Sequence, residues 1–559
     1  MATKPDVTKI KILQTSDVHG NFFPYDFINR CPGSGSLARI HSYVENQRKI
    51  YGDNLILIDN GDILQGQPTV YYYNFINTNT PHICAEMLNF MGYDLGNMGN
   101  HDIETGHNVY DRWIEQCNFP ILGANIIDTA TGKPYLTPYK TFERNGYKIA
   151  VLGLITPAIP AWLPETLWSG LRFDDMEESA RKWVKIIQDN ENPDIIIGVF
   201  HSGRDSSKKT GKWNENASLD IARNIPGFDI VLMGHDHQLF CQQIKSTNNK
   251  NVATLNPGGG ANYISDITIT FTNDGKTKDS TIEIQMVSIK DIEPSQAFMN
   301  HFKSQYNDVE KFVLQKIGTI TEKLDTRQAY FGPSTFVDFI HSLQLSISGA
   351  DISFAAPLSF DTTINKGDIY MSDMFNLYKY ENMLYVMNLT GKEIKDYLEY
   401  SYYIWTNQMT GPNDNLLKLK EAPTGDDKSR SVFVYPSYNF DSAAGIIYTV
   451  DVTKPKGEKI TIISLADGTP FDPNRMYRVA LNSYRGNGGG EILTKGAGIP
   501  QDQLASRIVS ATDKDLRYYL MEYIKQKGTL TPQALNQWKF IPEEWAKKAA
   551  EREYKLLFP

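Results

Sequence analysis

Residues 13–22 read LQTSDVHGNF, and they mark the place where an apolar segment gives way to polar side chains. The apolar run that ends at Leu13 predicts a buried strand. Asp17 and His19 follow that strand two positions apart, with Gly20 directly behind them. Two interpretations are open: an ordinary polar turn, or a carboxylate and an imidazole that both face a metal ion. The second interpretation requires further ligands from the rest of the chain.

The chain has 559 residues, which is enough for two or more domains. Its net charge of −9 and its lack of a Lys/Arg run argue against binding to a nucleic-acid polymer. No apolar run approaches the roughly 20 residues that span a membrane. The start, MATKPDVTKIKIL, has no signal-peptide core, which leaves open a cytosolic start or a removed export signal. The four cysteines lack CxxC spacing, so no zinc site or disulfide framework is expected, although one or two bridges stay open.

The order of predicted elements divides the chain into two domains and a connection. Residues 8–290 alternate strands and helices, and their continuous Val/Ile/Leu runs are typical of an α/β domain with buried strands. Residues 291–317 have helical periodicity after Pro294 and Ser295, so a connecting helix is expected there. Residues 318–559 mix helices and strands and predict an α+β domain, in which the hydrophilic stretch KEAPTGDDKSRS is an exposed loop.

Side chains that can bind metal follow five of the predicted strands. They are Asp17 and His19; Asp59 and Asp62; Asn100, His101 and Glu104; His201; and His235 and His237. The carboxyl ends of strands in a layered sheet share one edge, so these side chains are expected to meet there. In GHDH, residues 234–237, the i, i+2 spacing predicts that both imidazoles face the same side of an extended segment. Each group alone could be a loop, but their joint occurrence favours a metal site.

The order DxH, GD, GNH, H and GHxH resembles that of the calcineurin-like metallophosphoesterases across the N-terminal half of the chain. The resemblance implies a four-layer α/β/β/α sandwich that holds two divalent metal ions. Asp17, His19 and His237 would bind the first ion, Asn100, His201 and His235 the second, and Asp62 would bridge the two. Oxygen and imidazole ligands without thiolates suit Mn, Zn, Fe or Co. A hydroxide shared by the ions would attack the phosphorus of a phosphoester.

The same resemblance implies a catalytic role for His101, which directly follows Asn100. In family members this histidine lies near the leaving oxygen as a general acid or electrostatic aid, and a carboxylate orients it. Many related enzymes have Asp or Asn three residues later, whereas this chain has Glu104. Glu104 is therefore the expected partner and Asp102 the alternative. Asp59 is either a supporting carboxylate of the site or a buried turn residue.

The C-terminal region resembles the C-terminal domain of the 5′-nucleotidase family, so the resemblance covers nearly the whole chain. NLYKYENMLYVMNLTGKEIKDYLEYS, YPSYNFDSAAGIIYTVDVT and ALNSYRGNGGG look like segments of its periplasmic 2′,3′-cyclic-nucleotide 2′-phosphodiesterase/3′-nucleotidase branch. Tyr438 and Tyr484 lie in polar, turn-like settings, and two such rings can sandwich a nucleobase. Asn439, Asp441 and Asn482 are candidates for contacts to the edge of the base. Tyrosine at both positions favours this branch, because 5′-nucleotidases typically use Phe there.

One segment departs from the 5′-nucleotidase pattern. AAPLSFDTTINKGDIY lacks the arginine that ends the NGGGIR-like segment of those enzymes. Arg485 or Arg204 could meet the phosphate instead, or both could be exposed loop residues. The departure weakens a simple 5′-nucleotidase interpretation without excluding it.

The sequence thus predicts a monomeric, periplasmic or secreted hydrolase of 2′,3′-cyclic nucleotides and nucleoside 3′-monophosphates, with a cytoplasmic location left open. Its domains are expected to move about the helix near residues 295–317, because the base site and the metals must meet on one nucleotide. The alternatives are a 5′-nucleotidase or nucleotide-sugar hydrolase, and a non-catalytic surface binding protein, which the complete ligand set disfavours. A sulfur-oxidation thiol hydrolase would require a reactive cysteine, and no cysteine lies beside the motif residues.

Overall fold

The computed structural model describes residues 6–204, 209–273, 278–422 and 431–559. The chain forms two compact units, Met1–Val313 (the first unit) and Leu314–Pro559 (the second unit). Each unit is described here by itself. Most of the predicted loop KEAPTGDDKSRS lies outside the described residues.

The first unit is built on two six-stranded sheets. One has the order β16-β15-β1-β4-β5-β6, and the other has the order β13-β14-β12-β11-β9-β8. The first sheet comprises β1 (Asp6–Thr15), β4 (Leu55–Asp59), β5 (Leu95–Asn97), β6 (Ile121–Leu122), β15 (Tyr263–Asn273) and β16 (Lys278–Ser288). The second comprises β8 (Tyr139–Arg144), β9 (Tyr147–Ile155), β11 (Ile195–His201), β12 (Ile230–Met233), β13 (Phe240–Lys245) and β14 (Asn251–Asn256).

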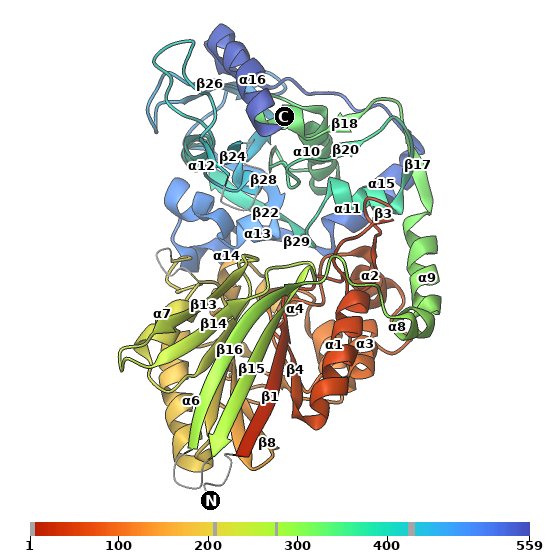
Figure 1. The fold of residues 1–559 in the computed structure, drawn as a ribbon. Helices are drawn as coiled ribbons and strands as arrows, with labels where there is room; N and C mark the ends of the chain where they lie inside the picture. Colours follow the sequence, from red (N-terminus) through yellow and green to blue (C-terminus); the bar gives the residue numbers. More distant parts are fainter. Residues whose placement is uncertain (1–5, 205–208, 274–277, 423–430) are drawn as a thin grey trace, which may run out of the picture. The chain divides into compact units, whose positions relative to one another are not determined.

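One hydrophobic core joins the two sheets, and helices cover their other faces. Ile12 of β1, Ile58 of β4, Val151 of β9 and Ile197 of β11 belong to this core. Helices α1 (Leu37–Tyr51), α3 (Ile83–Met91) and α5 (His107–Gln116) lie on the side of the first sheet, and α6 (Met176–Glu191) and α7 (Ser218–Asn224) pack on the second. In Figure 1, α1 and α3 lie on one side of the long strands β1, β15 and β16, and α6 on the other. The result is the predicted α/β/β/α sandwich.

Strand direction explains why the polar motifs meet. β1 runs parallel to β4, β4 to β5, and β11 to both β9 and β12. The carboxyl ends of parallel neighbours lie at the same edge of a sheet. β1, β4, β5, β11 and β12 are the five strands that precede the predicted ligands, so the fold brings those side chains to one rim.

The predicted connecting helix is interrupted. The structure has α8 (Gln296–His301) and α9 (Lys303–Val313), with a break at Phe302. Ser295 caps α8 by accepting a hydrogen bond from the Phe298 N–H at 3.3 Å, so the predicted start is right. Phe298 and Phe302 are fully buried against Phe90, and this packing fixes both helices to the first unit, which sequence periodicity alone did not indicate.

The second unit centres on a five-stranded sheet, β25-β19-β28-β22-β29, with two three-stranded sheets beside it, β27-β26-β31 and β21-β17-β30. The central strands are β19 (Ile352–Ala355), β22 (Met383–Thr390), β25 (Ser442–Ala444), β28 (Met476–Asn482) and β29 (Ile508–Asp515). The smaller sheets comprise β17 (Lys316–Ile320), β21 (Gly367–Tyr370), β26 (Ile446–Asp451), β27 (Ile460–Leu465), β30 (Thr529–Leu530) and β31 (Trp538–Ile541). The main helices are α10 (Thr335–Ser348), α12 (Gly391–Trp405), α15 (Leu516–Lys527) and α16 (Glu543–Leu557).

Local sequence explains one of these helices well. Thr390 and Glu393 form a reciprocal capping box at the start of α12, with hydrogen bonds of 3.2 and 2.8 Å between each side chain and the other residue's N–H. The apolar face of α12 then packs into an aromatic core, where Trp405 stacks on Phe440 with ring centroids 5.5 Å apart. Aromatic packing therefore accounts for part of the large tyrosine content, as Tyr397 and Tyr402 in the same core show.

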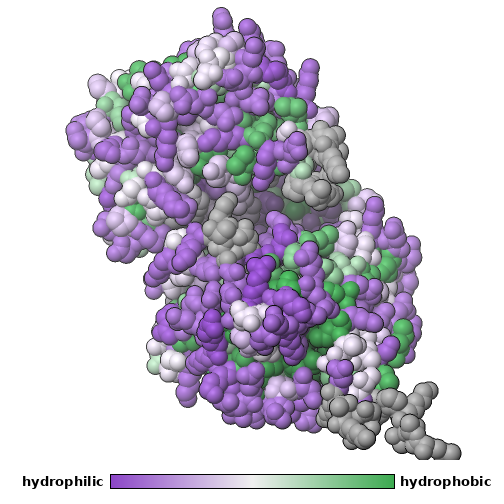
Figure 2. Space-filling model, turned by 60° about the vertical axis from the view of Figure 1, so that its left-hand side comes forward, coloured by the Kyte–Doolittle hydropathy of each residue, from purple (hydrophilic) through white to green (hydrophobic). Residues whose placement is uncertain are grey.

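The surface view, the helix lengths and the cysteines bear on three predictions from the composition. Figure 2 shows a face of mostly hydrophilic side chains with hydrophobic groups interspersed. Among the helices that the structure describes, none combines the length and apolar character of a membrane span. The four cysteines are unpaired: Cys31, Cys84, Cys117 and Cys241.

Candidate metal centre and substrate-binding loops

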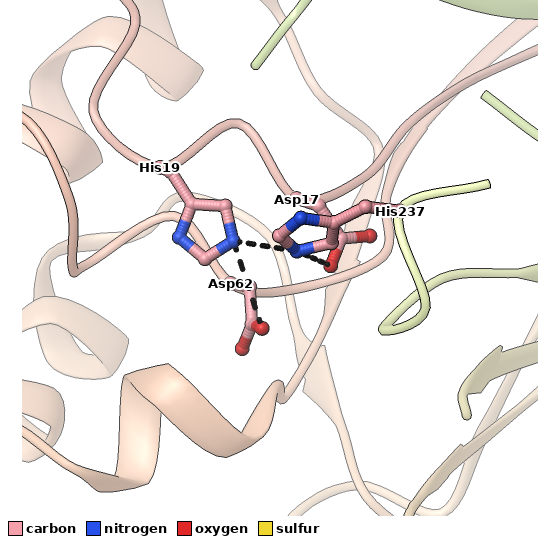
Figure 3. A group of neighbouring side chains, drawn as sticks. All are labelled: Asp17, His19, Asp62 and His237. Atoms are coloured by element: carbon pink, nitrogen blue, oxygen red, sulfur yellow. Dashed lines mark hydrogen bonds and ion pairs between the residues drawn. The ribbon is translucent and has the colours of Figure 1, made fainter. Parts of the chain in front are cut away.

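The first group of polar side chains contains Asp17, His19, Asp62 and His237, and their nearest ligand atoms all lie within 4.8 Å of one another. Asp17 and His19 follow β1, Asp62 follows β4, and His237 follows β12. His237 Nε2 lies 3.2 Å from Asp17 Oδ1 and 3.0 Å from His19 Nε2. Figure 3 shows that the two imidazoles and the two carboxylates converge on one point.

The second group contains Asp62, His201 and His235, again with ligand atoms within 4.8 Å. The side-chain oxygen of Asn100 joins it, 3.1 Å from His201 Nε2 and 2.8 Å from His235 Nδ1. Asp62 therefore belongs to both groups. The structure brings all seven predicted ligands together, in the division that the family resemblance implies.

GHDH does not form the extended segment that its spacing predicted. His235 and His237 have φ angles of 73° and 54°, so the backbone turns at each histidine. Their rings consequently serve different groups: His237 joins Asp17 and His19, whereas His235 joins Asn100 and His201. The i, i+2 argument for a shared direction was wrong.

Left-handed backbone is common among the predicted ligands. The φ angles are 51° at Asp17, 49° at His19 and 58° at Asp62, in addition to those of the two histidines above. Residues other than glycine rarely adopt such angles, and Asp, Asn and His are enriched among those that do. Five tight turns thus aim these side chains inward, a feature that the sequence pattern did not reveal.

The donor set fits divalent cations. Asp62 is 1% exposed, and its Oδ2 accepts no hydrogen bond among the described residues, although His201 Nε2 lies 3.0 Å away. The N–H at Nδ1 of His19 donates to the Gln65 carbonyl at 3.0 Å, and that of His201 donates to the Asn60 carbonyl at 2.6 Å. In neutral imidazoles this leaves the Nε2 lone pairs facing the cluster. A buried carboxylate such as Asp62 requires positive charge nearby, which protonated histidines supply in the metal-free protein and which bound cations would supply in their place.

The carboxylates of the cluster are held ionised. Burial would raise the pKa of Asp17, but the hydrogen bond from His237 and the charges of nearby histidines lower it to about 2. Burial also opposes ionisation of Asp62, yet His201 and His101 hold its pKa well below the usual value. Both groups are therefore anionic at neutral pH, which is the state that binds metal.

His101 lies at the edge of this cluster, with its ring centroid 5.4 Å from that of His19. Its Nδ1 forms a hydrogen bond with the Glu104 carboxylate. Burial would lower the pKa of His101, but the adjacent Glu104 charge raises it to about 9. The longer glutamate side chain thus reaches the histidine, in agreement with the prediction from the sequence.

The two other carboxylates near the site have different partners. Asp102 is fully buried and accepts hydrogen bonds of 2.8–2.9 Å from the N–H groups of Gly99, Asp62, Ile63 and Leu64. It holds the Asp62 turn and does not orient His101. Asp59 accepts from Thr15 Oγ1 at 2.8 Å and from the Gly61 N–H, so it is the buried turn carboxylate.

Sequence reasoning missed two residues beside His235. Glu215 Oε1 lies 2.8 Å from His235 Nε2, and the Trp162 ring stacks on the imidazole with centroids 5.7 Å apart and planes at 28°. Neither residue belongs to a strand end or to one of the recognised motifs. Only the folded backbone brings them to the site.

In the second unit, Tyr438 lies in a 3-10 helix (Ser437–Asn439) and Tyr484 in α13 (Ser483–Gly486). Their ring centroids are 6.3 Å apart, but the planes are perpendicular, at 82°. The rings are neighbours as predicted, yet they do not form the expected parallel sandwich. A parallel arrangement of the two rings would require one of them to turn.

Arg485 forms hydrogen bonds with all three polar residues that were expected to contact the base. Its buried guanidinium donates to both carboxylate oxygens of Asp441, at 2.9 and 3.1 Å, and to Asn439 Oδ1 at 3.1 Å. Asn482 caps α13 by accepting from the Arg485 N–H at 2.8 Å. Asp441 is 3% exposed, so the structure corrects its predicted role from base contact to buried ion pair.

The same ion pair corrects both interpretations of Arg485. With 1% of its side chain exposed, it is neither an exposed loop arginine nor available to a phosphate. Arg204 remains partly exposed, at 27%, and its Nε lies 3.3 Å from Asp236 Oδ2. Of the two arginines, Arg204 is the one that a ligand could reach.

Comparisons with known proteins agree with this geometry. Residues 10–239 match the calcineurin-like phosphoesterase family, and residues 316–495 match the 5′-nucleotidase C-terminal domain. The 2′,3′-cyclic-nucleotide 2′-phosphodiesterase/3′-nucleotidase of Haemophilus influenzae is 27% identical, over 96% of this chain and 88% of that protein. The trifunctional nucleotide phosphoesterase protein YfkN of Bacillus subtilis is 26% identical over 95% of this chain, which spans only 39% of that protein.

Solved structures share the fold. A Staphylococcus aureus protein crystallised with alpha-ketoglutarate has a TM-score of 0.80 at 22% identity, covering 95% of this chain and all of that one. The 5′-nucleotidase precursor from Thermus thermophilus has a TM-score of 0.64 at 18% identity, with 96% of this chain covered and all of that one. At these identities the likeness concerns architecture, and it extends over both units.

Proposed function

We propose that this chain, which matches the calcineurin-like phosphoesterase family over residues 10–239 and the 5′-nucleotidase C-terminal domain over residues 316–495, hydrolyses nucleotide phosphoesters and prefers 2′,3′-cyclic nucleotides and nucleoside 3′-monophosphates. The observation that supports it most is the pair of ligand groups that share Asp62. The relatives named for this activity, of which the Haemophilus influenzae protein is one, support the substrate choice. We also propose a periplasmic or secreted monomer.

Each residue has a proposed task. Asp17, His19 and His237 would hold one divalent ion, and Asn100, His201 and His235 a second, with Asp62 between them. Bound there, Mn, Zn, Fe or Co ions supply positive charge that polarises the phosphoryl group and lowers the pKa of a water. His101 would donate a proton to the departing ribose oxygen, and Glu104 would keep its ring in place through Nδ1.

The second unit would bind the nucleoside. Tyr438 and Tyr484 present neighbouring aromatic rings, on which a base of any kind can stack. Asn439 and Asn482 are already engaged by Arg485, so they shape the loops and are weaker candidates for base contacts than the tyrosines. This arrangement supports tolerance of different bases.

A 5′-nucleotidase is the second candidate, supported by relatives such as the Vibrio cholerae 5′-nucleotidase, which is 25% identical over 70% of this chain. The burial of Arg485 argues against it in one respect, because that side chain cannot replace the missing arginine of the NGGGIR-like segment. Of the two arginines considered as phosphate contacts in its place, only Arg204 is left.

The test is hydrolysis of 2′,3′-cAMP, 3′-AMP and 5′-AMP by metal-stripped protein reloaded with Mn²⁺. We expect turnover of the first two, and action on 5′-AMP alone would select the second candidate. Asp62→Asn should reduce turnover at least about 100-fold, because it removes the charge shared by both ligand groups. Asp53→Asn, at an exposed turn before β4, is the control and should leave the rate unchanged.

A further inference from the structure

His235 has the opposite ring orientation to two other predicted ligand histidines. His19 and His201 bind backbone carbonyls through Nδ1 and present Nε2 to the cluster. His235 presents Nδ1, which lies 2.8 Å from Asn100 Oδ1, while its Nε2 lies 2.8 Å from Glu215 Oε1. A carboxylate from another loop therefore holds the outer nitrogen of this ring.

Glu215 is itself fixed in place. Thr210 Oγ1 donates to its other carboxylate oxygen, and its backbone carbonyl accepts from Ser202 Oγ at 2.8 Å. The next side chain, Asn216, accepts from the Gly203 N–H at 3.0 Å. These bonds tie the Glu215 segment to the turn directly after His201, so one loop braces both histidines of the second ligand group.

The two ligand groups differ in charge. The first contains two carboxylates, Asp17 and the shared Asp62, whereas the second contains only one, Asp62, together with an amide oxygen and two imidazoles, those of Asn100, His201 and His235. Glu215 adds a negative charge directly behind the second group. A carboxylate behind a ligating histidine fixes its tautomer and makes the ring a stronger donor.

We propose that Glu215 is a positioning residue for the second metal ion. It keeps the proton of His235 on Nε2, leaves the Nδ1 lone pair directed at the ion, and compensates the smaller charge of that ligand group. Trp162 stacks on the ring and limits its rotation, so the hydrogen bond and the ring contact together define one orientation. The inference rests on the proposed function, because it requires that two ions bind.

The test is calorimetric titration of metal-stripped protein with Mn²⁺. The parent should bind two ions, and Glu215→Ala should weaken one of them about 10- to 100-fold without changing the other. Glu215→Gln keeps an acceptor for His235 Nε2 and should show a smaller loss. Glu45→Gln is the matched control, because Glu45 Oε2 lies 3.7 Å from His41 Nδ1 at a histidine–carboxylate pair that belongs to neither ligand group.

A second variant separates positioning from general structure. In a His235→Asn background, Glu215→Ala should have no further effect on Mn²⁺ affinity, since the two residues would act as one unit. Unchanged Mn²⁺ affinity at both sites in Glu215→Ala would overturn the proposal. An equal loss of affinity at both sites, together with a lower melting temperature of the metal-free protein, would also overturn it. A parent that binds fewer than two ions would overturn the dinuclear centre itself, and the inference with it.

Discussion

Gly99 offers a test of the site that leaves every ligand in place. It precedes the short helix α4 (Asn100–Ile103) and has φ and ψ of −106° and 165°, which an alanine adopts without strain. A Cβ on Gly99 would lie 2.2 Å from Asp62 Oδ1 and 2.3 Å from the Asp62 backbone nitrogen. Gly99→Ala therefore acts on Asp62 through steric contact and not through its own backbone.

The size of the effect follows from these distances. Cβ atoms essentially never approach other atoms closer than 3.0 Å, so a distance of 2.2 Å leaves a shortfall of 0.8 Å. Because the second contact is backbone, the Asp62 turn has to move and cannot simply rotate a side chain away. A displacement of about 1 Å at a catalytic group can reduce the rate about 100-fold, which corresponds to roughly 2.7 kcal/mol. Crowding of this kind also costs about 1–3 kcal/mol of stability.

The assay is kcat/KM for 2′,3′-cAMP with saturating Mn²⁺, together with urea denaturation. Gly332→Ala is the control, because a Cβ at Gly332 has no neighbour within 4 Å and its φ lies outside the left-handed region. A Gly99→Ala protein whose kcat/KM stays within about twofold of the parent would refute the claim that Asp62 must occupy its observed position.

Tyr438→Ala and Tyr484→Ala should each raise KM about 5- to 150-fold with kcat retained, since stacking on a base contributes roughly 1–3 kcal/mol; unchanged KM values would contradict the base site. Arg485→Met should lower the free energy of unfolding in urea by about 3–5 kcal/mol, because it leaves Asp441 buried without its partner. A loss under about 1 kcal/mol, as for a surface pair, would show that the ion pair is not structural. Burial lowers the pKa of His341 to about 3, so the unfolded chain binds a proton that the folded chain excludes between pH of about 6.5 and 3. Stability should therefore fall as the pH drops through that window, by about 5 kcal/mol at most, and His341→Gln should flatten the slope.

The strand ends that carry the candidate ligands were largely predictable, because an apolar run and the polar residues that follow it are local features of the sequence. Apolar runs located β1, β4, β11 and β12, whereas the short β5 has no such run; parallel pairing carried the Asp, Asn and His residues that follow these strands to one place. Asp62 and Asn100 could thus be named from the sequence as candidate ligands. The family order of the motifs divided the ligands between two groups, and the structure has the same division.

The contacts that the sequence could not predict depend on tertiary packing or on backbone angles. Glu215 reaches His235 from a loop with no regular pattern. Arg485 looked like a loop residue because it stands in a Gly-rich turn, but Asp441, 44 positions earlier, draws it into the interior. The helix is interrupted at Phe302, whose buried ring packs against Phe90, and helical periodicity indicated neither the break nor this contact.

The left-handed backbone at five predicted ligands affects how such a site could be lost in evolution. Each of these conformations costs about 1–2 kcal/mol for a residue other than glycine. Glycine at Asp17, His19 or Asp62 would relieve that cost and remove a ligand in the same step. Selection for stability alone would therefore remove the metal ligands. Relatives that have lost the activity should carry glycine at these positions more often than at other positions where a polar residue was replaced. An inactive relative could therefore be recognised by glycine at the positions of Asp17, His19 and Asp62.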